Sequence, residues 1–62
     1  MKWSELKRKA MKRKCIKIDE GANHERWQGP NGKIKNFSKH NNQNVPKKTL
    51  YDICKAFEIT LD

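Results

Sequence analysis

Two histidines, His24 and His40, carry the side chains of this chain best suited to exchange a proton at neutral pH. His24 follows Gly21-Ala22 at the start of a predicted strand, and Arg26 comes two residues later. Because side chains alternate along a strand, His24 and Arg26 are expected on one face of the sheet. A histidine beside a guanidinium can meet a phosphodiester and act as general acid or base. The competing interpretation is an ordinary surface histidine, which the spacing alone favours.

No second constellation for catalysis or metal binding is found in the sequence. His40 is predicted to end the third strand and to hydrogen-bond to backbone in a polar loop. Two separate histidines without paired carboxylates do not form a metal site, so neither metal nor cofactor is expected. Cys15 and Cys54 lack CxxC spacing and are predicted to be buried free thiols. The alternative is a disulfide, which would need their Cβ atoms close together.

The charge of the chain points to a polyanionic partner. Its 62 residues include 15 Lys and Arg against 7 Asp and Glu, for a formal net charge of +8. A domain this basic is expected to bind nucleic acid, with an acidic protein as the second candidate and a merely solvated cationic surface as the third. Lys47 and Lys48 should open a helix, where their charges add to its positive end and favour phosphate. The expected RNA contacts are Lys9, Arg26, Lys39, Lys47 and Lys48.

Further sequence features suggest how RNA could be held and where the protein works. Trp3 and Tyr51 are candidates for stacking on bases. The basic residues 7–9 on the first predicted helix and 12–17 around its end form further positive clusters. No apolar run is long enough to span a bilayer, and no signal peptide is recognised, so we expect a cytoplasmic protein without membrane contact.

Hydrophobic spacing predicts two helices separated by three strands. Trp3, Leu6 and Ala10 recur at helical spacing, and Ser4 is a candidate cap, which predicts a helix over about 4–13. Short alternating segments predict strands over 15–19, 23–28 and 33–38, with the strongest turn signal at 29–32. Within the third strand, Ile34 and Phe37 point to opposite faces unless a bulge intervenes.

A second amphipathic pattern closes the chain and completes the predicted fold. Apolar residues at spacing i, i+3, i+4 and i+7 predict a helix over about 46–57, with Pro46 at its first position: Leu50, Ile53, Cys54 and Phe57. The expected class is α+β in the order α-β-β-β-α, with a three-stranded antiparallel sheet and both helices on one face. Residues 1–62 are expected to form one domain.

The order and spacing of these motifs resemble the HicA family. The run Gly21-Ala22-Asn23-His24-Glu25-Arg26-Trp27 resembles its Gly-x-[Ser/Asn]-His core. The opening Lys2-Trp3-Ser4-Glu5-Leu6 is similar to the family's start, and Phe37-Ser38-Lys39-His40 is similar to its Val-Pro-x-His segment. The segment Val45-Pro46-Lys47-Lys48-Thr49-Leu50 resembles its closing helix. The chain departs from the commoner residues at Ala22, Ser38 and Lys48.

The resemblance implies a fold like a double-stranded-RNA-binding domain and a specific activity. It implies the toxin of a type II toxin–antitoxin pair, which cleaves mRNA without the ribosome and without metal. It assigns the catalytic role to His24 and implies a HicB-like antitoxin, which we expect to cover the sheet around His24 with an acidic surface. The alternatives are a non-catalytic RNA-binding module and, third, a DNA-binding regulator. The intervening sheet argues against the regulator, because it separates the two helices that a helix-turn-helix motif would need.

Overall fold

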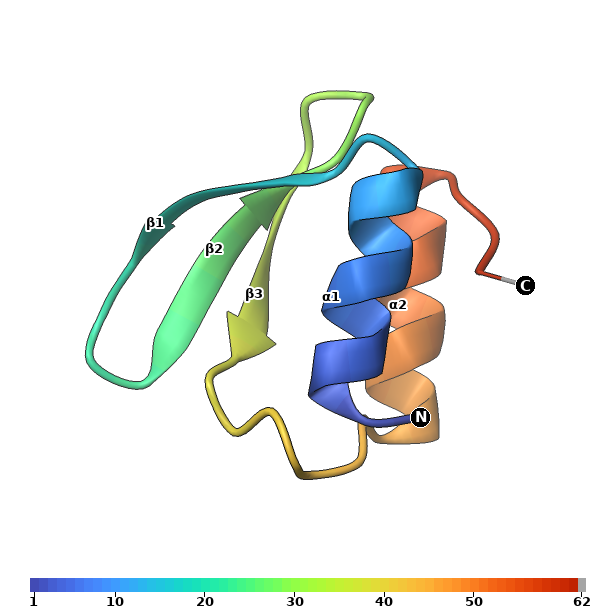
Figure 1. Cartoon of the computed structure of the whole chain (residues 1–62). Coiled ribbons are helices and arrows are strands. Elements are labelled where there is room, and N and C mark those ends of the chain that lie inside the picture. Colours follow the sequence, from blue (N-terminus) through green and yellow to red (C-terminus); the bar gives the residue numbers. More distant parts are fainter. Residues whose placement is uncertain (62) are drawn as a thin grey trace.

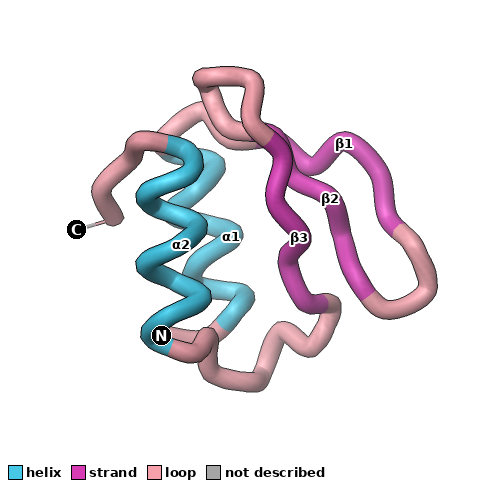
Figure 2. Tube along the Cα trace, turned by 180° about the vertical axis from the view of Figure 1, so that it is seen from behind, coloured by secondary structure: helices cyan, strands magenta, loops and turns pink. Residues whose placement is uncertain are grey.

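The computed structural model describes residues 1–61 as two helices packed on one face of a three-stranded sheet (Figures 1 and 2). Residue 62, the last of the predicted domain, lies outside the described residues. In chain order the elements are α1 (Trp3–Lys12), β1 (Ile16–Glu20), β2 (His24–Gln28), β3 (Ile34–Ser38) and α2 (Lys47–Phe57). The predicted α+β class, element order and placement of both helices are therefore confirmed. No helix within residues 1–61 is long and apolar enough to cross a membrane.

The start of α1 differs from the prediction, which had Ser4 as the capping residue. Lys2 occupies the cap position and makes no side-chain capping bond. The backbone N–H groups of Trp3 and Ser4 instead donate to the carbonyls of Gln43 and Asn41, at 3.0 and 3.2 Å. The loop between β3 and α2 thus supplies acceptors for the start of α1, where Trp3 is buried. At α2, Pro46 is the cap residue and the helix begins at Lys47.

The sheet is antiparallel throughout, in the order β1-β2-β3. β3 pairs with β2 without interruption, so Ile34 and Phe37 lie on opposite faces without a bulge. The irregularity lies in β1, where the register shifts between Lys17 and Asp19. This bulge makes Ile18 the extra residue and places Asp19 opposite Arg26.

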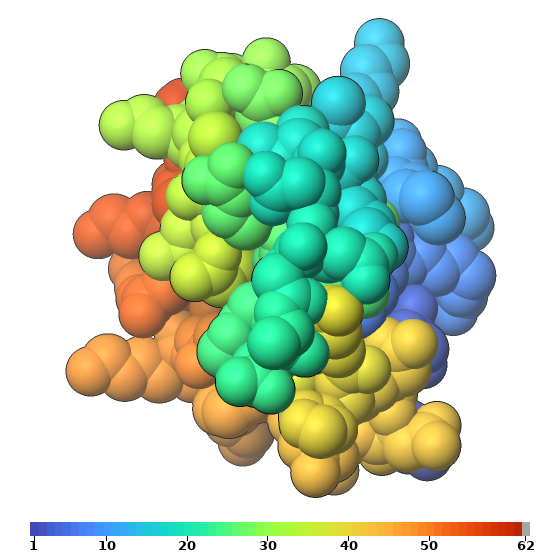
Figure 3. All heavy atoms as spheres, turned by 90° about the vertical axis from the view of Figure 1, so that its left-hand side faces the viewer, coloured from blue at the N-terminus to red at the C-terminus, as the bar shows by residue number. Residues whose placement is uncertain are grey.

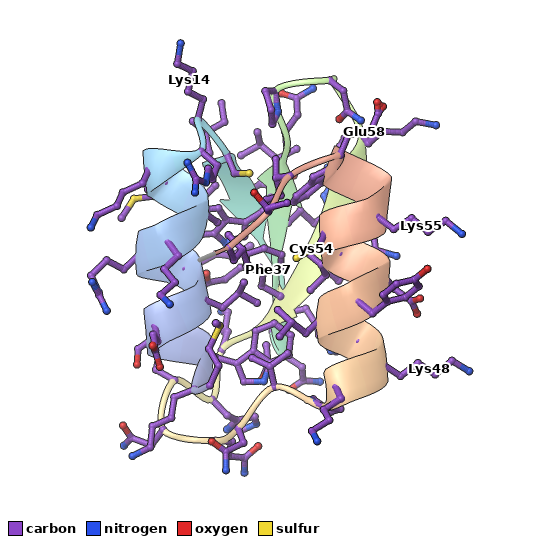
Figure 4. The ribbon with its side chains drawn as sticks, turned by 90° about the vertical axis from the view of Figure 1, so that its right-hand side faces the viewer. Lys14, Phe37, Lys48, Cys54, Lys55 and Glu58 are labelled. Carbon is purple, nitrogen blue, oxygen red and sulfur yellow. The ribbon has the colours of Figure 1, made fainter. Side chains whose placement is uncertain are left out.

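Phe37 lies between the sheet and both helices, at the centre of the core (Figure 4). The ring of Trp27 stacks on it at 5.0 Å between centroids, and the rings of Trp3 and Phe57 lie at 5.7 and 6.3 Å. The remaining core residues are Leu6, Ala10, Cys15, Val45 and Ile53. This aromatic cluster packs both helices against β2 and β3. It therefore also determines which side chains of those strands point to the outer face.

Both cysteines are free thiols, as predicted, but only Cys15 is fully buried. Cys54 is half-buried on the inner side of α2 (Figure 4). Burial raises the pKa of both thiols. The proximity of Cys54 raises the pKa of Cys15 as well, but by less than burial does. Neither cysteine is therefore an activated nucleophile.

Candidate functional site

His24 is exposed on the outer face of the sheet, where β2 begins. The turn before it is closed by a 2.8 Å hydrogen bond from the Gly21 N–H to the His24 carbonyl. Across the sheet His24 pairs with Ser38, and Arg26 pairs with Asn36, so these four side chains share one face. Figure 3 looks onto this face, with the β1–β2 turn in teal and green above the yellow β3–α2 loop. The predicted common face of His24 and Arg26 is confirmed.

His24 separates two hollows in the surface, and both of them include Asn36. The first is an open hollow of about 470 Å³, formed mainly by the β1–β2 hairpin. The second, of about 350 Å³, lies between the sheet, the β3–α2 loop and the start of α2. Apart from His24 and Asn36, its lining residues are Trp3, Ser38, Gln43, Asn44, Pro46 and Thr49. His24 is therefore in a position to meet a group bound in either hollow.

The first hollow is lined by carboxylates that are already paired with cations. Arg26 donates from Nε to Asp19 Oδ1 at 2.8 Å and from Nη2 to Oδ2 at 2.5 Å. These bonds lower the pKa of Asp19 and raise that of Arg26. Hydrogen bonds from Lys17 and Lys39 lower the pKa of Glu20 to about 2. Neither carboxylate can donate a proton at neutral pH, and Arg26 keeps only its remaining N–H groups for a phosphate.

The other predicted RNA contacts divide into paired and unpaired lysines. Lys39 bonds Glu20 at 2.9 Å, and Lys9 pairs with Glu5 across one helical turn at 3.6 Å. Lys47 and Lys48 are exposed, and neither forms an ion pair within residues 1–61. The side chain of Lys48 extends away from α2 (Figure 4). Lys47 and Lys48 therefore offer the least compensated charge among the five predicted contacts.

The first turn of α2 presents unsatisfied backbone donors beside the second hollow. No side chain caps the helix, and its first turn has no acidic residue. The first helical bond runs from the Leu50 N–H to the Pro46 carbonyl at 2.9 Å, which leaves the amides of residues 47–49 without an intrahelical acceptor. Pro46 and Thr49 line the hollow with His24. Free amides, lysine charge and the helix dipole together favour an anion here.

Lys7 belongs to the basic cluster predicted on the first helix, but its side chain is buried. Its Nζ lies 3.1 Å from Glu25 Oε2 and donates to Asn41 Oδ1 at 2.6 Å. The side chains of Lys7 and Glu25 are only 11% and 13% exposed, and Trp27 Nε1 donates to the same carboxylate at 3.0 Å. Lys7 is therefore a structural charge that joins α1 to β2, because Glu25 lies on the inner face of the sheet.

His40 and Tyr51 lie outside the centre of this site, and Trp3 is mostly buried. His40 lines neither hollow, and its backbone N–H donates to Ser38 Oγ at 3.0 Å, where the chain turns into the loop. Trp3 is 6% exposed, so only a rim of its ring reaches the second hollow. Tyr51 is 63% exposed on α2, with the Lys55 ammonium 5.8 Å from its ring centroid. Tyr51 remains open for stacking.

The second hollow was missed by sequence reasoning, and so were its amide side chains. Asn36, Gln43 and Asn44 come from β3 and the following loop, which the sequence describes only as polar. The alternation of β3 could have placed Asn36 on the face of His24. No group of three potential metal ligands occurs among residues 1–61. Comparisons of the chain with protein families, with curated proteins and with solved structures give no match.

Proposed function

We propose that this chain is a metal-independent endoribonuclease of the HicA type, which cleaves mRNA as the toxin of a type II toxin–antitoxin pair. The observation that carries the proposal is the position of His24. It lines the same hollow as the uncapped start of α2, which bears Lys47 and Lys48. A proton-exchanging group beside an anion site is the minimum that RNA cleavage needs.

RNA supplies its own nucleophile, the 2′-hydroxyl. The protein has to hold the phosphate, move protons and stabilise the negative charge of the pentacovalent state. In the proposed mechanism, the α2 amides and Lys47 and Lys48 hold phosphate, and His24 moves the proton. Arg26 and Lys39 have a secondary role, since Asp19 and Glu20 already occupy them. With one histidine in the site, the rate should be modest.

The proposal includes the partner and the fold relationship that the motifs imply. A HicB-like antitoxin with an acidic surface would cover His24 and the lysines, and so block RNA. The order α-β-β-β-α and the two helices on one face support a likeness to double-stranded-RNA-binding domains. Cytoplasmic mRNA is the substrate that such a toxin meets.

A non-catalytic RNA-binding module is the second candidate, and one observation favours it. The two hollows bring no second group to His24 that could give a proton at neutral pH, because His40 lines neither of them and the carboxylates in the first are held deprotonated. Incubating the purified protein with a labelled transcript, with and without a chelator, distinguishes the two. We expect cleavage in both conditions. Binding without cleavage would select the module, and cleavage only without chelator would contradict the metal-independent mechanism.

A further inference from the structure

We propose that the hollow between His24 and the start of α2 binds one unpaired adenine base, next to the phosphodiester at which His24 moves the proton. This inference deepens the proposed ribonuclease function and rests on it for the position of the cleaved bond. It assigns base recognition to the side-chain amides of Asn36, Gln43 and Asn44. Base selection would then be separate from phosphate binding, which belongs to Lys47 and Lys48.

The wall of this hollow has the composition of a base-binding site. Its polar groups are three carboxamides, two hydroxyls and one imidazole, and its apolar residues are Trp3 and Pro46. No lysine, arginine or carboxylate lines it. Its volume of about 350 Å³ lies at the small end of ligand pockets. Unpaired RNA bases are recognised by such sites, which combine hydrogen bonds to base edges with stacking on flat apolar groups.

The carboxamides are available to a ligand and are held on a fixed backbone. Within residues 1–61, no intramolecular hydrogen bond engages the side chains of Asn36, Gln43 or Asn44. The backbone of Gln43 accepts from Trp3 and donates to His40, each at 3.0 Å. Asn44 forms a bridge with Lys2, and Asn36 pairs with Arg26 in the sheet. These backbone bonds reduce the ordering that binding requires.

A carboxamide can bond the Watson–Crick edge of any unpaired base, so selection of adenine requires that the base presents its N6/N7 edge to the wall. A carboxamide presents one donor and one acceptor side by side, which matches N7 and the N6 amino group of adenine. Guanine is read best by Arg or Lys, and cytosine by Asp or Glu, and neither pair of residue types lines this hollow. Uracil has a smaller ring to stack on the rim of Trp3 and on Pro46. A good bidentate contact gives a preference of roughly fivefold or more.

The test measures base preference in cleavage and in binding separately. Short single-stranded RNAs with every base at each position are digested by the wild type, and cut sites are sequenced. The same assay uses Gln43→Glu and Asn44→Asp, both exposed positions, with Asn42→Asp as the matched control outside both hollows. Binding uses oligonucleotides with methylated 2′-hydroxyls, which cannot be cut, and with a single adenine, guanine, cytosine or uracil.

We expect wild type and Asn42→Asp to cut next to adenine at least roughly fivefold faster than next to other bases. Gln43→Glu and Asn44→Asp should lose this preference while still cutting RNA. Cutting without base preference, or preference for another base, overturns the inference but leaves the ribonuclease intact. If the wild type does not cut, the ribonuclease fails, and adenine-selective binding that both variants lose would still support the base site. Equal binding of all four oligonucleotides then overturns it.

Discussion

Lys7 on α1 and Glu25 on β2 form an ion pair of 3.1 Å that is almost closed to solvent. Removing one member leaves an uncompensated charge, so Lys7→Met and Glu25→Gln should each lower the free energy of unfolding by roughly 3 kcal/mol. The double variant should recover part of that loss, because it removes both charges. Urea denaturation measures all three. The partly exposed pair Lys9–Glu5, changed in the same way, should cost less than about 1 kcal/mol, and equal costs for the two pairs would refute a structural role for Lys7.

The Glu25 carboxylate also makes the stability of the fold depend on pH. Burial raises the pKa of Glu25, but hydrogen bonds from Trp27 and Lys7 outweigh it, so the folded pKa lies below the ordinary 4.5. A lowered folded pKa adds stability above the unfolded pKa, and that stability is lost as the pH falls below 4.5. Glu20, with a pKa of about 2, acts in the same direction down to that pH. Thermal unfolding at pH 7 and pH 3 should show a smaller acid loss in Glu25→Gln than in the wild type.

Two glycines should respond differently to the same substitution. A Cβ on Gly29 would lie 2.6 Å from the Phe57 ring, whereas a Cβ on Gly21 meets nothing closer than 3.9 Å. Gly29→Ala should destabilise the fold by about 1–3 kcal/mol, because the ring and the β2–β3 turn must separate. Gly21→Ala should fold like the wild type. The order of their unfolding midpoints in urea checks this, and a reversed order would show that Phe57 does not pack against the turn.

Lys48 and Lys55 lie on the same helix and extend from it to the same side (Figure 4), but only Lys48 is beside the proposed phosphate site. Lys48→Glu should weaken RNA binding for all sequences, and Lys47→Glu with Lys48→Glu should weaken it further. The dependence of log affinity on log salt should lose about 0.7 for each lost contact with single-stranded RNA. Fluorescence anisotropy at several salt concentrations gives this slope. An equal effect of Lys55→Glu would mean that general charge, rather than the helix start, holds RNA.

The sequence allowed the fold to be predicted because local patterns determined each element. The spacing of Leu50, Ile53 and Phe57 predicted α2, and alternation predicted which face of β2 carries His24. The role of Lys7 was not predictable, because a lysine within a basic helix is normally solvated. Its burial depends on the position of Glu25 across the interior. The bulge at Ile18 was not predicted, since only the pairing of β1 with β2 reveals it.

The candidate site was predicted only where its residues follow from local order. His24 and the Lys47–Lys48 start of α2 came from motif and helix rules, and the structure places the histidine and that helix start at one hollow. The ion pairs of Arg26 and Lys39 depend on the β1 register, so sequence reasoning took both charges as available. The amides of the second hollow come from segments whose approach depends on tertiary packing.

His24→Ala tests the catalytic role of His24. The side chain is exposed, so its removal should change the free energy of unfolding by less than about 0.5 kcal/mol. His40→Ala is the matched control, since His40 is also exposed but lines neither hollow. Circular dichroism and RNA binding should show that both variants fold and bind RNA, and each should still bind the proposed antitoxin.

The deciding measurement is the rate of transcript cleavage by these two variants beside the wild type, with chelator present. The proposed mechanism predicts that the cleavage rate of His24→Ala falls by roughly a hundredfold or more, as expected for removal of a general acid or base. The variant should also lose its toxicity. His40→Ala should keep most of the wild-type rate. A folded His24→Ala protein that cuts RNA at the wild-type rate would contradict the catalytic assignment.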